Sequence, residues 1–516
     1  MPSSELLSDE LRSFCQSKSI SEEGLRDLIE RHGLTPKNNF DVRDYMFFNA
    51  ACRNKRVTEG IIQCLLNYFP DAACATDGKG WTPLHFACSN KNMTLGIIQL
   101  LIDAAPDSVR SVSNKGSTPI HKLCDNSKLS EANSIQILEF LLEKHPGATR
   151  YFNNDGNLPI HVAAGGKYPE FCRLLIEAYP GSVRITGQLG ALPFHHACFH
   201  STLDMVEYFY QFHPDAIDHP TTNGRATGSY PIHCAIAGLI KKGNPAVVEI
   251  VKFLLNCDPN VKLQKCNGKS LLHYACWVDY TDSIIETALQ IIKTIYDAHP
   301  EAIEEDRIVS DTQNYDHQVQ GFINSELVYA RQAKDHRLMT TPDENGRLPL
   351  HRALQNNFRL GSIKLLVKGN PSAIRNVDNN FALPLHIACE HHDSAGVVQY
   401  LLGLDPSTLD AVDRQGNTAL HYACRGAKHD TIVMLLEKYD AVSVSKRDVH
   451  GKLPIDLLWE SDSGEDEGSL RYTESVFQLL RAYPEMVKIG NLALGQPVNV
   501  NDETRNGKKR KFGHAA

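Results

Sequence analysis

Histidine and cysteine recur together along this chain at a spacing that could support metal binding or nucleophilic catalysis. Six pairs have the two residues three positions apart: His85/Cys88, His121/Cys124, His195/Cys198, His273/Cys276, His386/Cys389 and His421/Cys424. On a helix, such a pair could ligate zinc or form a thiolate–imidazole couple. A structural zinc ion needs four converging ligands, however, and these pairs recur about 35 residues apart, on repeats that we expect to be about 10 Å apart, the width of a helix. Cys52 occupies the same position without a preceding histidine, so we interpret this cysteine as a small buried residue and predict no metal site.

Two other segments are similar to ligand-binding patterns but admit simpler interpretations. Asn267-Gly-Lys-Ser270 is similar to the end of a phosphate-binding loop, but the glycine that the motif needs five residues before Gly268 is Leu263. Residues 390–393 (Glu-His-His-Asp) could bind a metal ion, although a solvated helix end explains them better. No serine-hydrolase, zinc-protease or protein-kinase motif occurs. We predict no catalytic residue and no cofactor, and we expect that the protein is not an enzyme, since the roughly 40 residues of the one irregular stretch, 300–345, are too few to build a pocket of their own.

The histidines belong to a phrase that recurs ten times and whose first copy is Gly80-Trp-Thr-Pro-Leu-His85. The copies end at His85, His121, His161, His195, His233, His273, His351, His386, His421 and Asp456. Successive ends differ by 36, 40, 34, 38, 40, 78, 35, 35 and 35 residues, and a weaker copy places Asn49 36 residues before His85. The interval of 78 is about two periods and hides either a degenerate repeat or an insertion. We therefore expect about eleven units between residues 40 and 490.

Each unit contains two helices. The second half, as in residues 96–106, has apolar residues at i, i+3, i+4 and i+7 and ends at a proline, which is typical of an amphipathic helix that cannot continue. In the first half, Thr82 stands where an N-cap hydroxyl belongs and Pro83 where the first helical position tolerates proline. We predict a turn, a short helix, a second turn, a longer helix and then an extended segment, such as residues 108–112.

The phrase Thr-Pro-Leu-His-x-Ala at this period resembles the ankyrin repeat, and the resemblance covers roughly 450 of the 516 residues. The chain departs from the family pattern at two places. A hydroxyl residue is kept before the proline position only at Thr82, Thr118, Ser270 and Thr418. The glycine that follows the second helix in the family is here mostly proline, as at Pro106. The resemblance implies an all-α repeat, an ankyrin-repeat solenoid of stacked helix-turn-helix units with finger turns, in which the histidine bonds to turn backbone.

The resemblance also implies a function in recognition. A stack of such units has no closed pocket by construction and presents a concave surface, made of the fingers and the exposed sides of the first helices, to a protein partner. We expect a scaffold or adaptor whose contacts come from residues just after the histidine, because aromatic residues and arginine are common binding anchors. The candidates are Phe86, His196, Tyr274, Trp277, Arg352, Tyr422 and Arg425.

The repeats divide the chain into five regions. Residues 1–40 contain two short amphipathic stretches that we interpret as N-terminal capping helices, and residues 41–303 form a first array. Residues 304–343 break the period and are predicted to be an insertion loop, which either contacts a partner or is a tolerated loop. A second array covers 344–490, and 491–516 form a disordered basic tail.

The tail provides an alternative function. Residues 501–516 carry a net charge of +3 against −8 for the whole chain, which leaves −11 for the rest. The run Lys508, Lys509, Arg510 and Lys511 is of the kind that nuclear import receptors bind, which would suit a nuclear regulatory protein or transcription cofactor.

Composition sets the remaining bounds. Hydrophobic residues make up 42% and charged residues 22%, which is globular usage, and no apolar run approaches 18 residues. The beginning of the chain lacks the features of a secretory signal, so we expect the fourteen cysteines to be reduced thiols in the cytoplasm, the nucleus or both. The negative net charge argues against nucleic-acid binding. We expect a monomer without membrane contact.

Overall fold

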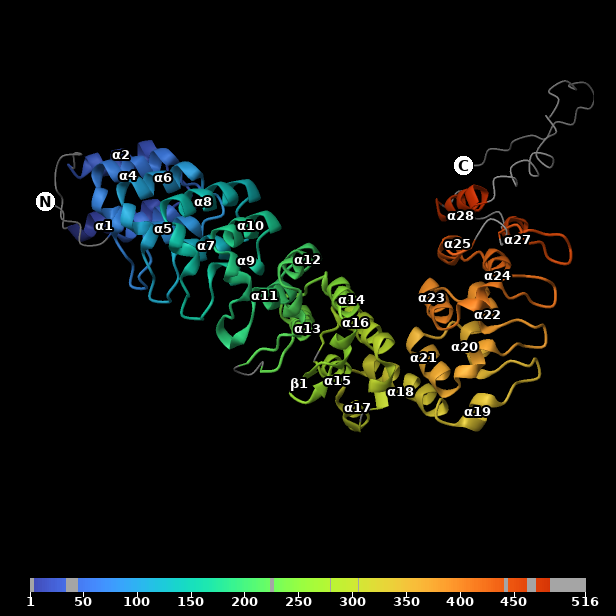
Figure 1. Cartoon of the computed structure of the whole chain (residues 1–516). Helices are drawn as coiled ribbons and strands as arrows, with labels where there is room; N and C mark the ends of the chain where they lie inside the picture. Colours follow the sequence, from blue (N-terminus) through green and yellow to red (C-terminus); the bar gives the residue numbers. More distant parts are fainter. Residues whose placement is uncertain are drawn as a thin grey trace, which may run out of the picture. The chain divides into compact units, whose positions relative to one another are not determined.

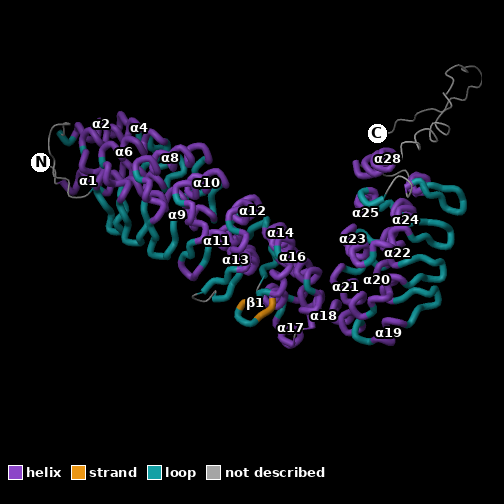
Figure 2. Tube along the Cα trace, viewed as in Figure 1, coloured by secondary structure: helices purple, strands orange, loops and turns teal. Residues whose placement is uncertain are grey.

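The computed structural model describes residues 4–33, 45–222, 227–278, 280–304, 306–439, 444–461 and 470–482 (Figure 1). The chain divides into two compact units, Met1–Leu327 and Val328–Ala516. Both consist of stacked helices joined by loops, and the one sheet among the described residues is an antiparallel hairpin of β1 (Lys265–Cys266) and β2 (Lys269–Ser270) (Figure 2). The predicted all-α repeat solenoid is confirmed.

Each repeat begins with a short inner helix that contains the recurring phrase. In the first unit the inner helices are α3 (Met46–Arg53), α5 (Pro83–Cys88), α7 (Pro119–Asp125), α9 (Pro159–Ala164), α11 (Pro193–His200), α13 (Pro231–Lys242) and α15 (Leu271–Trp277). In the second unit they are α20 (Pro349–Gln355), α22 (Pro384–His391), α24 (Ala419–Arg425) and α27 (Pro454–Ser461). Each inner helix packs against the next one along its unit. Proline begins most of them because its fixed φ suits the first helical position, where no N–H is needed.

An outer helix, in most repeats the longer of the two, follows each inner helix and packs against its neighbours in the same way. In the first unit the outer helices are α4 (Glu59–Tyr68), α6 (Leu95–Ala104), α8 (Glu131–Lys144), α10 (Pro169–Ala178), α12 (Leu203–Phe212), α14 (Val247–Cys257) and α16 (Ile285–Ala298). In the second unit they are α21 (Leu360–Gly369), α23 (Ala395–Leu404), α25 (His429–Leu436) and α28 (Leu470–Ala482). In α6, for example, Ile97, Ile98, Leu101 and Ile102 are buried. The core of each unit therefore lies between its inner and outer helices.

Proline also determines the turn after most outer helices, which differs from the sequence prediction. We expected residues 108–112 to be extended, but Pro106–Arg110 form a 3-10 turn, η2, and Ser111 is the first extended residue. Equivalent turns are η1 (Pro70–Cys74), η3 (Pro146–Arg150), η4 (Pro180–Arg184), η6 (Pro214–Asp218), η8 (Pro259–Leu263), η9 (Pro300–Glu304), η11 (Pro371–Arg375) and η12 (Pro406–Asp410). The fixed φ of proline starts a tight turn instead of an extended strand.

In six of the repeats the recurring histidine links its own helix to the segment that follows. The backbone N–H of Thr82 donates to Nδ1 of His85 at 3.2 Å, and Nε2 of His85 donates to the carbonyl oxygen of Ser117 in the following finger at 2.9 Å. Because Nδ1 accepts a hydrogen bond, the ring proton resides on Nε2. His121, His161, His195, His386 and His421 make the same pair of contacts.

Two helices precede the first repeat, where we predicted N-terminal capping helices over 1–40. Helix α1 (Ser4–Gln16) packs against α3, and α2 (Glu22–Arg31) packs against α4. The predicted division into five regions otherwise remains a prediction.

Residues 304–343, which we expected to be an insertion loop, contain helices. They are α17 (Asp306–Asp311), a 3-10 turn η10 (Thr312–Asn314), α18 (His317–Gln332) and α19 (His336–Thr340). In the next repeat the 3-10 turn η11 begins at Pro371, 15 residues before His386. Helix α19 begins at the equivalent place, 15 residues before His351, so it replaces the 3-10 turn of a repeat. Helix α18, which precedes it, replaces the outer helix. Helix α17 directly follows η9 and packs against α15, without a finger between them. The interval of 78 residues therefore contains a degenerate repeat.

The missing finger changes one histidine contact. Nε2 of His273 lies 3.0 Å from Oδ2 of Asp311 in α17, whereas the equivalent histidines bond to a finger carbonyl. A carboxylate at the end of α17 thus replaces the backbone acceptor.

Candidate functional site

The side chains of the histidine–cysteine pairs have structural roles in the repeats. In five of the six pairs, those of His85, His121, His195, His386 and His421, both ring nitrogens bond to backbone, which leaves neither for a metal ion or a thiol. Cys88, Cys198 and Cys424 are fully buried, and burial raises the pKa of their thiols well above the ordinary value. The described residues contain no group of three His, Cys, Asp or Glu side chains that could hold a metal ion. These pairs therefore cap helices and fill the core.

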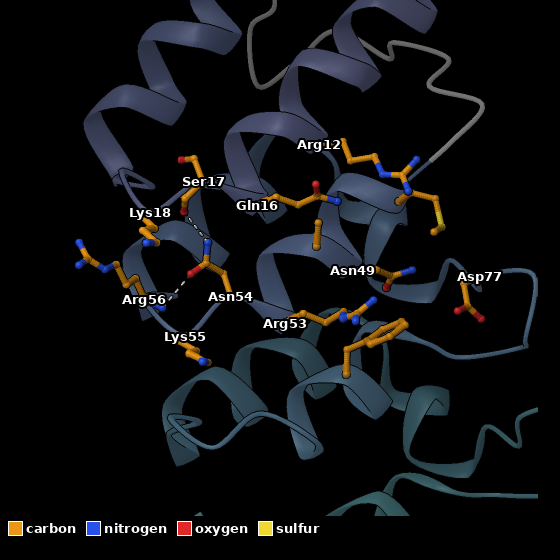
Figure 3. A pocket seen from close by; sticks show the side chains of 13 residues that line it. Arg12, Gln16, Ser17, Lys18, Asn49, Arg53, Asn54, Lys55, Arg56 and Asp77 are labelled. Carbon is orange, nitrogen blue, oxygen red and sulfur yellow. Dashed lines mark hydrogen bonds between the residues drawn. The ribbon is translucent and has the colours of Figure 1, made fainter. Parts of the chain in front are cut away.

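Two hollows of the first unit lie along the surface of its described inner helices. The first, here called the cationic pocket, has a volume of about 630 Å³ (Figure 3). It is lined by Arg12, Gln16, Ser17, Lys18, Met46, Asn49, Ala50, Arg53, Asn54, Lys55, Arg56, Asp77 and Phe86. These residues come from α1, α3, the turn after each of these helices, the following finger and α5.

Hydrogen bonds from one asparagine fix the two turns that carry most of the positive charge. Nδ2 of Asn54 donates to the carbonyl oxygens of Cys15 and Ser17, both at 2.8 Å, and the N–H of Arg56 donates to Oδ1 of Asn54 at 2.9 Å (Figure 3). The end of α1 and the turn after α3 are thereby held side by side. Of the predicted contact residues, Phe86 is the one found here; its ring is buried beneath the guanidinium of Arg53, 5.5 Å from the ring centroid.

The second hollow, here called the histidine pocket, has a volume of about 540 Å³ and a mostly apolar lining. It is lined by Asn157, Leu189, Ala191, His195, His196, Phe199, His200, Thr221, Ser229, His233, Cys234, Ala237, Ile240, Cys266, Asn267 and Tyr274. Two of the predicted contact residues, His196 and Tyr274, are half-buried in it. The ring of His196 packs edge-on against His161 at 5.7 Å, and the ring of Tyr274 packs edge-on against His233 at 4.8 Å.

Three imidazoles of the histidine pocket, those of His195, His196 and His233, have a lowered pKa and are neutral at neutral pH. Burial lowers the pKa of His195 and His233 to about 3, and burial beside His200 lowers the pKa of His196 to about 4. The N–H of Tyr230 donates to Nδ1 of His233, but Nε2 of His233 has no hydrogen-bond partner among the described residues. The pocket thus combines apolar surface with an unused donor.

The remaining predicted contact residues differ in their surroundings. Trp277 is 47% exposed, with the ammonium of Lys269 3.2 Å from its ring centroid. Arg352 is exposed. Tyr422 and Arg425, in contrast, make internal contacts: the Tyr422 hydroxyl donates to Oδ2 of Asp413 at 2.9 Å.

Arg425 is held by both a carboxylate and an aromatic ring. Its Nε and Nη2 donate to the two carboxylate oxygens of Glu390 at 2.7 and 3.0 Å, and its guanidinium lies 4.2 Å from the ring centroid of Tyr422. Arg425 therefore connects α24 to α22. Because Tyr422 and Arg425 are engaged in these internal contacts, they are poorer candidates for contact with a partner than the residues in the pockets.

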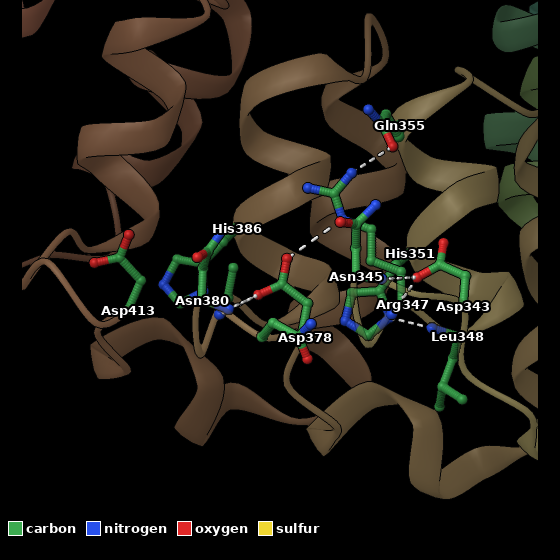
Figure 4. A network of polar contacts seen from close by, with 12 residues as sticks. Asp343, Asn345, Arg347, Leu348, His351, Gln355, Asp378, Asn380, His386 and Asp413 are labelled. Atoms are coloured by element: carbon green, nitrogen blue, oxygen red, sulfur yellow. Dashed lines mark hydrogen bonds and ion pairs between the residues drawn. The ribbon is translucent and has the colours of Figure 1, made fainter.

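Polar contacts also join the fingers of the second unit. Oδ1 of Asp343 accepts the N–H of Asn345 and Arg347, and Oδ1 of Asp378 accepts that of Asn380 and Ala382, at 2.8–3.0 Å (Figure 4). Nε of Arg347 reaches across to Oδ2 of Asp378 at 3.3 Å. Backbone hydrogen bonds add to this, as from Asn379 N–H to the carbonyl of Asn345 at 3.0 Å.

Comparison with known families identifies the repeat. A model described as ankyrin repeats (3 copies) matches residues 47–149, 90–186 and 360–448, and one described as ankyrin repeat matches residues 227–263. The chain belongs to the ankyrin-repeat family. No curated protein matches it.

Ankyrin repeats mediate protein–protein interactions and are typically interaction modules, not enzymes. In this ankyrin-repeat protein, none of the described helices is long and apolar enough to cross a membrane. The nuclear-import candidates Lys508, Lys509, Arg510 and Lys511 lie outside the described residues, and the comparisons give no support to a nuclear regulatory role.

Sequence reasoning missed the cationic pocket of this ankyrin-repeat protein. Arg12 and Arg53 are about 40 residues apart, and neither lies in a copy of the recurring phrase. One signal was present: Arg53 stands four residues after Asn49, as Trp277 and Arg425 stand four residues after their histidines. Extending the search for contact residues to the weak first copy would have found it.

Proposed function

We propose that this protein is a non-enzymatic scaffold or adaptor that binds a protein partner on the concave ankyrin surface of its first unit. The histidine pocket is the observation that carries this proposal. Its volume of about 540 Å³ is within the range of pockets that hold specific ligands, and its lining is mostly apolar. A hollow of this kind accepts an apolar or aromatic side chain, which is the usual anchor of a protein interface.

The polar groups of the pocket define the partner further. Because Nδ1 of His233 accepts the N–H of Tyr230, the one proton of the neutral ring is on Nε2, which can only donate. The matching group on a partner is an acceptor next to the anchoring side chain, which every peptide backbone supplies as a carbonyl. A buried donor without a partner is costly, so satisfying it upon binding contributes to affinity.

The test uses the double variant His196→Ala/Tyr274→Ala of the full chain. Proteins captured by the wild-type chain are identified, and the affinity of each purified candidate is then measured against both forms. We expect at least about a tenfold loss of affinity, because truncating a central anchor costs roughly 2 kcal/mol.

The matched control is Tyr168→Ala, which removes an exposed aromatic residue at the start of the outer helix α10, away from the pocket. Circular dichroism of all forms verifies that the fold is retained. A partner bound equally well by the double variant and the wild type, but lost with Tyr168→Ala, would contradict the assignment to the concave surface.

A further inference from the structure

Five exposed cations gather on the cationic pocket although the chain as a whole is acidic. Arg12 lies on α1, Lys18 in the turn that follows, Arg53 at the end of α3, and Lys55 and Arg56 in the next turn. The net charge of the chain is −8, yet Asp77 is the one acidic residue that lines this pocket. None of the five cations forms an ion pair with another described residue. The local excess of positive charge is therefore available to a ligand.

The positions of these cations are fixed before any ligand arrives. The two hydrogen bonds from Asn54 to Cys15 and Ser17 tie the Lys18 turn to the Lys55–Arg56 turn. Nδ2 of Asn90 in the next repeat donates to the carbonyls of Cys52 and Asn54, both at 2.9 Å, and so anchors the same turn from the other side. A rigid backbone that presents like charges together lowers the ordering cost of binding an anion.

The pocket also contains hydrogen-bond acceptors. Asn49, at the position that histidine occupies in other repeats, is 3% exposed, and its Oδ1 has no hydrogen-bond partner among the described residues. Asp77 contributes a carboxylate. The oxygens of inorganic phosphate at neutral pH can accept hydrogen bonds from the cations, but phosphate has few donors to offer to the Asn49 and Asp77 oxygens. A peptide supplies both carboxylates and backbone N–H groups.

We infer that the cationic pocket binds a short acidic segment of a protein partner, with its carboxylates on Arg12, Arg53 and Arg56. The guanidinium groups suit this role because they pair with carboxylates through two parallel hydrogen bonds. The inference rests on the proposed function in that the ligand is a protein. It uses a different pocket of the same unit, however, and the inner helices α7 and α9 separate the two pockets along the stack.

The experiment measures binding of a fluorescein-labelled decapeptide of alternating Glu and Ala to the purified full chain by fluorescence anisotropy. The counterpart peptide has Gln in place of each Glu. We expect saturable binding of the Glu peptide that weakens about tenfold between about 50 and 300 mM salt, because the salt screens exposed charges, and no saturation with the Gln peptide.

Matched variants locate the binding. Arg53→Ala/Arg56→Ala should weaken the Glu peptide at least about tenfold, since each lost charge-assisted bond is worth roughly 1 kcal/mol or more. Lys91→Ala/Lys115→Ala, which removes two exposed cations of the same unit outside the pocket, should change the affinity less than about twofold. Circular dichroism verifies that both variants fold.

Three outcomes would overturn the inference. The first is that both double variants lose the same affinity for the Glu peptide. The second is that the Gln peptide also binds with saturation. The third is that millimolar inorganic phosphate displaces the Glu peptide fully, which would indicate a simple anion site. The variant His196→Ala/Tyr274→Ala should bind the peptide like the wild type. If peptide binding fails while partner affinity still depends on the histidine pocket, the inference is wrong and the proposed function stands.

Discussion

The fingers of the two units share one turn but differ in the side chain that accepts hydrogen bonds from the turn's backbone. In the second unit four successive fingers begin with aspartate: Asp343, Asp378, Asp413 and Asp448. Each aspartate accepts the N–H groups of the residues two and four positions later, at 2.8–3.0 Å. Among the described residues of the first unit this arrangement occurs at Asp77; the next fingers begin with Ser113, Asn153, Gly187 and Thr221.

The difference affects how many backbone groups each finger satisfies. Ser113 and Asn153 each accept the N–H of the residue four positions later, and Thr221 accepts that of Ser229, eight positions later. Gly187 has no side chain to accept any. The histidine pocket lies where these irregular fingers meet, with Leu189, Thr221 and Ser229 in its lining. Regular aspartate turns thus give the fingers of the second unit one conformation. In the first unit the fingers lack these regular turns around the histidine pocket.

The largest predicted difference between the units is their response to acid. In the first unit, burial lowers the pKa of His85 and His121 to about 4 and that of His161, His195 and His233 to about 3. In the unfolded chain the pKa of histidine is about 6.5. The unfolded chain therefore binds protons that the folded chain cannot, so each histidine stabilises the fold fully above pH 6.5 and loses this contribution as the pH falls toward its folded pKa.

Hydrogen exchange of the full chain, corrected for the intrinsic pH dependence, measures this effect. Between about pH 6.5 and 4.5, the free energy of opening should fall by about 1.4 kcal/mol per pH unit for each histidine that an opening event exposes. In the second unit burial lowers the pKa of three histidines of the phrase, His351, His386 and His421, and the total loss should be smaller. The variant His161→Gln should flatten the slope around α9. Equal slopes in both units would contradict the prediction.

The second prediction compares one finger residue from each unit. Asp413 is buried and accepts hydrogen bonds from the N–H of Gln415, the N–H and side chain of Asn417, and the hydroxyl of Tyr422. Asp413→Ala leaves these donors unpaired and should lower the free energy of unfolding by about 3 kcal/mol, whereas Ser113→Ala removes one acceptor and should cost about 1 kcal/mol. Urea unfolding followed by circular dichroism measures both. If the two costs are the same, side-chain acceptors do not distinguish the units.

The repeat explains why much of this structure could be predicted from the sequence. A period near 35 residues, an N-cap hydroxyl at Thr82 and a proline after most outer helices are local signals, and the helices follow them. The degenerate repeat in 304–343 carries none of these signals, since it has neither the phrase nor a finger. Its apolar positions Val319, Ile323 and Leu327 are buried at a spacing of four, which indicates a helix only once the surrounding repeats are aligned.

The site was less predictable because its residues come together only in the folded chain. Three residues at the position after the histidine, Phe86, His196 and Tyr274, line pockets. Whether such a residue is available to a partner depends on its neighbours in the next repeat. Tyr422 donates to Asp413 in its own finger, and Arg425 donates to Glu390 on the previous inner helix. No single repeat reveals these contacts.

The smallest predicted effect concerns two glycines at the same finger position. Gly80 and Gly451 have φ of +73° and +79°, so alanine at either costs about 1 kcal/mol of backbone strain. At Gly451 a Cβ atom would meet no described atom within 4 Å, whereas at Gly80 it would lie 2.7 Å from Oδ1 and 3.0 Å from the N atom of Asn114. Gly80→Ala must therefore also displace the finger that donates from Asn114 N–H to the carbonyl of Lys79.

We expect Gly80→Ala to lower the free energy of unfolding by about 2 kcal/mol and Gly451→Ala by about 1 kcal/mol, since only the first adds a steric clash to the strain. Urea unfolding compares the totals, and hydrogen exchange at Asn114 reports whether the bond between fingers opens. Faster exchange at Asn114 in Gly80→Ala, with no change at the fingers next to Gly451→Ala, would show that the fingers are coupled through close backbone packing. Equal costs with unchanged exchange would mean that each finger is stabilised by its own turn alone, and that the side-chain acceptors at its first position account for the difference between the units.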